Sequence, residues 1–434
     1  MMILTLFWGC TDPCLSEGEH LSSEDVSIGD RSWTRTTISE GICGSAFISS
    51  ADVNGDSEPE LLVANFGRPD GISLPMGHIS MFSFGSSVQE YEYTEPLSAE
   101  DEYRWPNDIE AHDLDEDGDL DLIVGSGFLT CQLSPWSAPC GSLIWLENRS
   151  DGSDWQVHEI VSKGDDLFFH KPLVEDFNSD GFLDIIAVGE SYKTPIKGDY
   201  DAQVLLFLGT DIGSFSEPIF LAQGLGSIPQ IWDVDQDGDL DVVSGEYFAN
   251  LEASYVWLEQ IEPPSEQSPG GIWERHIIDD SVGPTIQFLM VEDLLGDGVA
   301  RAIGSNHSNT QSSSPDPWTS SIIVYTPTDN PKDRWEKTPI YEGFVSVPSS
   351  NQAAPGVFDV GDVGQDGDWD ILVSGDGDPK VVLLEQEEGM FVPHIVSEDM
   401  PQAGVHLTDL QSDGRLELVV GSYEKNLIYV YEEQ

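Results

Sequence analysis

A nine-residue acidic pattern recurs seven times along this chain, and no other feature limits its folds as strongly. The pattern is Asp-x-(Asp/Asn)-x-Asp-Gly-x-x-(Asp/Glu) followed by a β-branched run, and its copies begin at Asp52, Asp113, Asp176, Asp233, Asp293, Asp362 and Asp409. Successive copies start 61, 63, 57, 60, 69 and 47 residues apart. A near-constant period of this length indicates a repeat architecture in which neighbouring units bury a shared core.

The segments between the copies also repeat. Each acidic loop is followed by an apolar run such as 122–125 and then by a second run such as 143–146. A third run has the pattern Trp-x-x-His-x-Ile at 155–160 and 273–278, with looser versions at 335–340 and 391–396. A further short apolar run, such as 109–111, leads into the next loop. The runs are bounded by Gly, Pro, Asn and Ser, which predicts strands rather than helices. Four strands in each of seven units predict an all-β fold, a seven-bladed β-propeller.

The two ends of the chain complement each other. The last repeat stops at Gln434 without a Trp-x-x-His-x-Ile strand, whereas a matching segment, residues 33–39, precedes the first repeat. We therefore expect residues 33–39 to pair into the last blade and close the ring, which removes an exposed sheet edge. The propeller then covers residues 33–434.

The loops and the strand order resemble the FG-GAP or VCBS repeats of integrin α-chain propellers and of many bacterial surface proteins. The resemblance covers about residues 33–434. It implies calcium in the loop between the first two strands of each blade. It also implies that these loops lie on one face, and that the loops between second and third strands lie on the opposite face with the links between blades.

The residue types in the loops suit calcium, which takes six to eight hard oxygen ligands. Side chains at positions 1, 3 and 5 point at one centre, glycine at position 6 permits the turn, position 7 offers a carbonyl, and the carboxylate at position 9 closes the cage. We expect about six Ca²⁺ ions, held most strongly by loops two and four. The expected ligands are Asp52, Asn54, Asp56, Glu58, Glu60, Asp113, Asp115, Asp117, Asp119, Asp121, Asp176, Asn178, Asp180, Phe182, Asp184, Asp233, Asp235, Asp237, Asp239, Asp241, Asp362, Asp366, Asp368, Asp370, Asp409, Gln411, Asp413, Arg415 and Glu417. The alternative is a set of Asx-turns without metal.

The fifth loop departs from the pattern. Leu295 cannot coordinate an ion, and Arg301 stands where the closing carboxylate belongs. We expect Arg301 to pair with Asp293 or Asp297 and to replace the ion with an internal salt bridge.

The N-terminus carries an apolar segment that runs directly into Cys10. Residues 1–10 resemble the end of a bacterial lipoprotein signal peptide, in which the cysteine is lipidated. Residues 11–32 are expected to form a flexible tether. With Cys10 lipidated, the other four cysteines are expected to pair as Cys14–Cys43 and Cys131–Cys140 in an oxidising compartment. The alternative is an apolar N-terminus with free thiols.

Acids outnumber bases 80 to 17, which gives a net charge of −63. Nucleic acid is excluded as a partner because phosphate binding needs a basic surface. Membrane contact is expected only through the lipid anchor. We expect an exported monomer, at a bacterial outer membrane or cell surface through that anchor, or secreted.

Aromatic residues gather on the loops and links opposite the calcium loops. The candidate ligand-binding residues there are Tyr103, Arg104, Trp105, Trp136, His170, Lys171, Tyr192, Tyr247 and Trp318. Loop aromatics mark binding surfaces, although they can also fill the loops and cover the channel.

Motifs for catalysis are absent from the sequence: it has no G-x-S-x-G, H-E-x-x-H or P-loop. We therefore expect no catalytic residues, and we favour a calcium-stabilised binding or adhesion propeller that recognises a protein or glycan. One alternative is a polysaccharide-active, lyase-like enzyme, which would need His, Tyr, Arg or Lys side chains converging over the central channel. Another is a structural envelope component.

Overall fold

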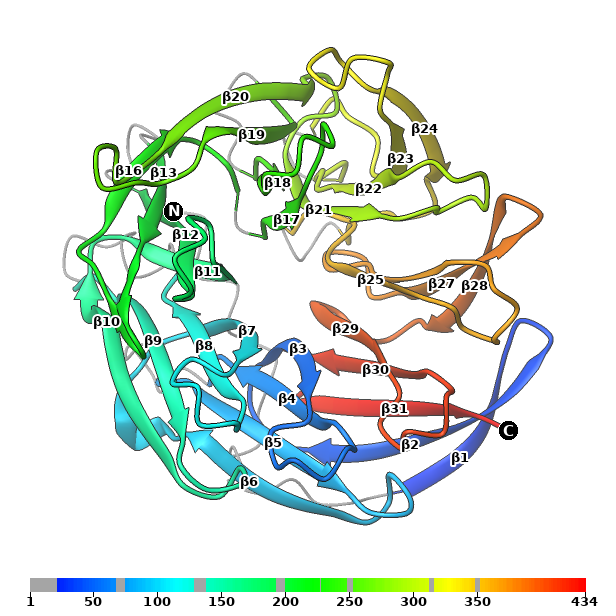
Figure 1. The fold of residues 1–434 in the computed structure, drawn as a ribbon. Helices are drawn as coiled ribbons and strands as arrows, with labels where there is room; N and C mark the ends of the chain where they lie inside the picture. The colour runs from blue at the N-terminus through cyan, green and yellow to red at the C-terminus, as the bar shows by residue number, and fades with distance from the viewer. Residues whose placement is uncertain are drawn as a thin grey trace.

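A computed structural model describes residues 22–67, 75–128, 138–192, 200–226, 228–247, 253–311, 316–347 and 352–434. Seven antiparallel sheets stand around a central axis like the blades of a propeller (Figure 1). The sheets are blade 1 with β3 (Ser45–Ala51), β4 (Glu60–Asn65), β5 (His78–Phe84) and β6 (Tyr91–Leu97); blade 2 with β7 (Pro106–His112), β8 (Asp121–Ser126), β9 (Gly141–Asn148) and β10 (Trp155–Asp165); blade 3 with β11 (Phe168–Glu175), β12 (Asp184–Tyr192), β13 (Tyr200–Phe207) and β16 (Ile219–Gln223); blade 4 with β17 (Gln230–Trp232), β18 (Asp241–Gly245), β19 (Tyr255–Glu262) and β20 (Ile272–Asp279); blade 5 with β21 (Thr285–Val291), β22 (Arg301–Asn306), β23 (Ile322–Thr326) and β24 (Glu336–Tyr341); blade 6 with β25 (Phe358–Gly361), β26 (Asp370–Ser374), β27 (Val381–Glu387) and β28 (Met390–Ser397); and blade 7 with β29 (Ala403–Thr408), β30 (Glu417–Ser422), β31 (Leu427–Glu433) and β2 (Arg31–Glu40). The prediction of a seven-bladed propeller is confirmed.

Four further elements complete the described secondary structure. They are β1 (Ser22–Ile28), the hairpin of β14 (Gly209–Asp211) and β15 (Ser214–Phe215), and the 3₁₀ helix η1 (Ala99–Asp101). Among the described residues, no helix is long and apolar enough to cross a membrane.

The second strand of most blades is buried on both faces. Every residue of β4, β8 and β22 is buried, and the apolar residues at the centre of each strand are the short apolar runs seen in the sequence. The outermost strands alternate or are exposed, as β24 is. Most of the hydrophobic core therefore lies between neighbouring blades, as with Val63 of blade 1 and Val419 of blade 7, which share one cluster.

The N-terminal strand closes the ring as predicted. Strand β2 pairs with β31, with Trp33 opposite Glu433 and Thr36 opposite Val430. Figure 1 shows β2 and β31 side by side in one sheet.

The predicted tether over residues 11–32 is wrong for its last part. Residues 22–28 form β1, a fifth strand that pairs with β2 along its full length, from Ser22 opposite Thr37 to Ile28 opposite Arg31. The segment was predicted as a tether because most of its residues are polar. Two apolar side chains anchor it: Ile28 is buried in the core of the last blade, and Val26 packs against this core. Residues 1–21, with Cys10 and Cys14, lie outside the described residues.

Candidate functional site

The acidic loops connect the first and second strands of each blade and are organised by their own hydrogen bonds. In loop two, the backbone N–H groups of Asp117 and Gly118 donate to the Asp113 carboxylate, both at 3.1 Å. The N–H of Asp119 donates to Asp117 at 3.0 Å. Loops three, four, six and seven repeat this arrangement. The backbone turns left-handed at position 6, with φ of 101° at Gly118, a conformation that glycine adopts without strain; loop one has Ser57 there, with φ of 75°.

Carboxylates converge in loops two and four, the two loops predicted to bind calcium most strongly. One oxygen from each carboxylate of a loop lies within 4.8 Å of the other two; the sets are Asp113, Asp115 and Asp117, and Asp233, Asp235 and Asp237. Burial and the neighbouring Asp117 carboxylate raise the pKa of Asp115, and burial and Asp237 do the same for Asp235. Three like charges this close repel one another, and a divalent cation would relieve that repulsion.

The carboxylate at position 9 has a structural role that the sequence analysis did not predict. Asp241 is buried and accepts two backbone hydrogen bonds, from Val234 at 2.9 Å and from Gln260 at 2.9 Å. It thereby ties the acidic loop to the end of the third strand. Asp121, Asp184 and Asp370 make the same pair of bonds. Burial raises the pKa of Asp241 to about 7.

The fifth loop contains the predicted salt bridge. The guanidinium of Arg301 makes two bonds to the Asp297 carboxylate, at 2.6 and 2.7 Å. Its Nε donates to Oγ1 of Thr326 on β23 at 3.1 Å. Arg301 therefore links the loop to the third strand, as the position 9 carboxylate does in other blades. Asp297 is the partner, and its hydrogen bonds from Arg301 hold the pKa of Asp297 below its usual value.

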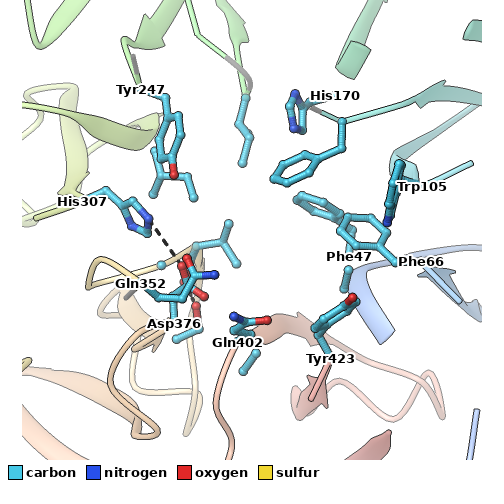
Figure 2. A pocket seen from close by; sticks show the side chains of 18 residues that line it. Phe47, Phe66, Trp105, His170, Tyr247, His307, Gln352, Asp376, Gln402 and Tyr423 are labelled. Carbon is cyan, nitrogen blue, oxygen red and sulfur yellow. Dashed lines mark hydrogen bonds and ion pairs between the residues drawn. The ribbon is translucent and has the colours of Figure 1, made fainter. Parts of the chain in front are cut away.

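The central channel opens into a pocket of about 190 Å³ at the face opposite the acidic loops (Figure 2). Five of its lining side chains share one repeat position, six residues after position 9 of their loop, where the second strand ends. These residues are Phe66, Tyr247, His307, Asp376 and Tyr423. The repeat thus delivers one side chain from each of these blades to the axis.

Aromatic rings make up one wall of this pocket. The ring of Phe66 lies 5.7 Å from Tyr423, 6.1 Å from Phe47 and 6.3 Å from Phe128, measured between centroids. Trp105 lies 6.4 Å from Phe128. Figure 2 shows Phe47, Phe66 and Trp105 together on one side of the pocket.

Hydrogen-bonding groups make up the opposite wall. Nδ1 of His307 lies 2.7 Å from the carbonyl oxygen of Pro355, so this nitrogen carries the proton and donates. Its Nε2 lies 3.4 Å from Oδ2 of Asp376. The Tyr247 ring packs 5.2 Å from the His307 ring, and Gln352 and Gln402 complete this side (Figure 2). Burial raises the pKa of Asp376, and His307 opposes that rise.

Three of the predicted ligand-binding residues, Trp105, His170 and Tyr247, line the pocket. His170 is held there by Glu190, whose Oε2 lies 2.8 Å from its Nδ1.

The other predicted residues have different positions. Lys171 faces the channel nearer the acidic loops. Tyr103 packs between blades and donates to Glu159 at 3.0 Å. Arg104 and Trp318 are half-buried outside the pocket wall, and Trp318 packs on Gly283. Trp136 and the side chain of Tyr192 lie outside the described residues.

Several residues that line the pocket were not predicted from the sequence. They are Phe47, Phe128, His307, Gln352, Asp376, Gln402 and Tyr423. For His307, Asp376 and Tyr423 the sequence did contain a signal. They stand six residues after position 9 of their loops, where the copies differ in chemistry although the strand before them repeats.

Comparisons with known proteins do not assign this chain to a family. No model of a protein family and no curated protein matches the sequence. Among solved structures, the chain is similar to a protein of Bacteroides fragilis NCTC 9343 described as a 6-phosphogluconolactonase, with 12% identity, a TM-score of 0.47, and 90% of this chain and 97% of that chain covered. It is also similar to the NanB sialidase of Streptococcus pneumoniae, with 12% identity, a TM-score of 0.40, and 95% and 70% covered. Neither likeness assigns a function to this chain.

Proposed function

We propose that this chain is an exported binding propeller whose aromatic pocket takes one neutral sugar residue of a glycan. The observation that carries this proposal is the pairing of two unlike walls across a pocket of about 190 Å³. Phe66 and Tyr423 offer flat apolar surfaces on which the C–H face of a sugar ring packs. Asp376, Gln352 and Gln402 face them with groups that hydrogen-bond to hydroxyls.

Charge favours a neutral glycan over an acidic one. The described wall of the pocket contains no lysine or arginine, and it contains the Asp376 carboxylate. The chain as a whole carries a net charge of −63. A uronate or a phosphorylated sugar would therefore be repelled, both locally and at long range.

The lyase-like alternative has one observation in its favour. Tyr247, His307, His170 and Tyr423 converge over the channel, as an acid–base site would require. The described wall lacks a lysine or arginine that would neutralise a uronate carboxyl group. Binding is therefore the better-supported function. Release of an unsaturated product from a polyuronate would instead show that the chain is a lyase.

A glycan array tests the binding proposal. We expect neutral glycans to bind the native chain and Tyr423→Phe, which keeps the ring. Tyr423→Ala should weaken binding about two- to twelvefold, since a lost aromatic stacking contact costs about 0.5–1.5 kcal/mol. The matched control is Phe220→Ala, because Phe220 is 55% exposed on β16, away from the pocket. Equal binding by Tyr423→Ala and the native chain would contradict the proposal, and selective capture of proteins would favour a protein ligand.

We also propose that six acidic loops hold calcium, and that the chain is of the FG-GAP or VCBS type. The converging carboxylates of loops two and four and the shared turn geometry support this proposal. The ion would neutralise carboxylates that otherwise repel one another, so its role would be structural.

Export through a lipidated Cys10, with disulfides Cys14–Cys43 and Cys131–Cys140, completes the proposal. The two pairings are compatible with the disulfide-bonded state of Cys43 and Cys140. The proposed partners Cys14 and Cys131 lie outside the described residues.

A further inference from the structure

A second cavity occupies the end of the central channel beside the acidic loops. Its volume is about 380 Å³, and inner strands of the blades form most of its wall. Phe47, Ile228 and Val357 line both this cavity and the aromatic pocket, so the two cavities follow one another along the channel.

Three side chains from different blades form a hydrogen-bonded series in this wall. Oγ of Ser50 on β3 lies 2.9 Å from Nε2 of His406 on β29. Nδ1 of His406 lies 2.7 Å from Oδ2 of Asp359 on β25. All three are half-buried and line the cavity. This is the geometry of a nucleophile, its general base and an orienting carboxylate, which is identified by geometry and not by sequence position.

The Asp359 carboxylate sets the direction of each hydrogen bond. It can only accept, so neutral His406 keeps its proton on Nδ1 and presents a free lone pair on Nε2. The Ser50 hydroxyl must then donate to Nε2. Thr408, whose Oγ1 lies 2.8 Å from Oγ of Ser50, donates to Ser50 in turn. The hydroxyl of Ser50 is thus aimed at the base that would remove its proton.

The orienting carboxylate is itself fixed. Oδ2 of Asp359 also accepts the backbone N–H of Leu407 at 2.9 Å, and Oδ1 accepts that of Val360 at 2.8 Å. Burial alone would raise the pKa of Asp359, but the hydrogen bond from His406 and these backbone bonds hold it below its ordinary value. Asp359 therefore stays an anion that keeps the imidazole in one tautomer and one orientation.

We propose that Ser50, His406 and Asp359 form an acyl-transfer site that hydrolyses small neutral esters. Oγ of Ser50 attacks the ester carbonyl carbon while its proton passes to Nε2 of His406. The C–O bond to the alcohol then breaks, and the alcohol leaves with that proton. Water, deprotonated by His406, then attacks the acyl-serine. The bond between the acyl carbon and Oγ breaks, the carboxylic acid leaves, and His406 returns its proton to Oγ of Ser50. Asp359 acts through His406 as a positioning residue.

The rest of the cavity wall limits the substrate. Asp108 and Glu110 line it, and the only lysine or arginine in its described wall is Lys171, whose Nζ lies 2.8 Å from Oε1 of Glu110. The remaining negative charge disfavours anionic substrates, and the volume of about 380 Å³ admits only a small molecule.

Covalent labelling of the full-length chain with a neutral fluorophosphonate tests this site. Peptide mass spectrometry should find the phosphonyl adduct on Ser50, formed with loss of fluoride. Ser50→Ala should abolish labelling and hydrolysis of p-nitrophenyl acetate, and His406→Gln should slow both at least about a hundredfold. Ser49→Ala is the matched control, because Ser49 is the neighbour of Ser50 on the same strand and its hydroxyl is buried without a hydrogen-bond partner. It should label at the native rate.

The positioning role of Asp359 needs its own readout. Asp359→Asn should slow labelling at least about tenfold, and Asp359→Glu should recover part of the rate at an unchanged melting temperature. Labelling of Ser50→Ala at the native rate, or no adduct on Ser50 in the folded native chain, would overturn the proposal. Glycan binding by Ser50→Ala should be normal, so failure at one site is distinguishable from failure at the other.

Discussion

At the scale of single residues, the carboxylate at position 9 explains how an acidic loop can be part of a buried framework. Asp241 sits at the start of β18 with 1% of its surface exposed. Its two oxygens accept the backbone N–H groups of Val234 and Gln260. In blade 5, Arg301 links the loop to the third strand by donating a hydrogen bond to the Thr326 hydroxyl. The residue type at this position therefore changes the chemistry of the loop while preserving its link to the third strand.

Replacing Asp241 tests this framework role. Asp241→Ala should leave the N–H groups of Val234 and Gln260 without an acceptor, and so lower the free energy of unfolding by about 2–4 kcal/mol. Urea denaturation in EDTA measures this loss without a contribution from metal. Asp239→Asn, at position 7 of the same loop, should change stability by less than about 0.5 kcal/mol. An Asp241→Ala loss no larger than that of Asp239→Asn would show that the two backbone bonds stabilise little.

At the scale of elements, the closure of the ring makes the N-terminal strands part of the fold. Trp33 on β2 is fully buried in the cluster that also contains Leu418 and Tyr431 of the last blade. Strand β1 then covers β2, so the sheet has five strands. The polar residues of β1 concealed it in the sequence, because only Val26 and Ile28 face the core.

Trp33→Ala tests how much the closure contributes. The loss of a fully buried indole should lower the free energy of unfolding by about 3–5 kcal/mol. Trp369 is the matched control, because it is 37% exposed, and Trp369→Ala should cost less than about 1 kcal/mol. Equal losses in the two variants, measured by urea denaturation, would mean that the propeller is stable without its closing strand.

At the scale of the whole molecule, repetition determined what could be predicted from sequence. The seven acidic loops reveal the number of blades and the closure, because each copy adds independent support to the same period. The Arg301 salt bridge was also predictable, since one residue broke a pattern that its equivalents keep. The carboxylates of loops two and four converge as their composition suggested.

The central channel was much less predictable. Ser50 and His406 are 356 residues apart in sequence and meet only because the ring brings blade 1 beside blade 7. Phe66, Asp376 and Tyr423 meet for the same reason. Local patterns describe a blade, whereas the channel is made of one side chain from each of several blades, and no short motif records that combination.

The calcium content of the purified chain, measured by elemental analysis after dialysis against metal-free buffer containing a low concentration of calcium, tests the central claim most directly. We expect about six ions per chain, not seven, because the Arg301–Asp297 pair closes the fifth loop. EDTA should remove these ions and lower the melting temperature, since uncompensated carboxylates then repel one another. If the chain retains no calcium, or if EDTA leaves its melting temperature unchanged, the proposal of calcium sites is wrong and the seven loops are hydrogen-bonded turns without metal.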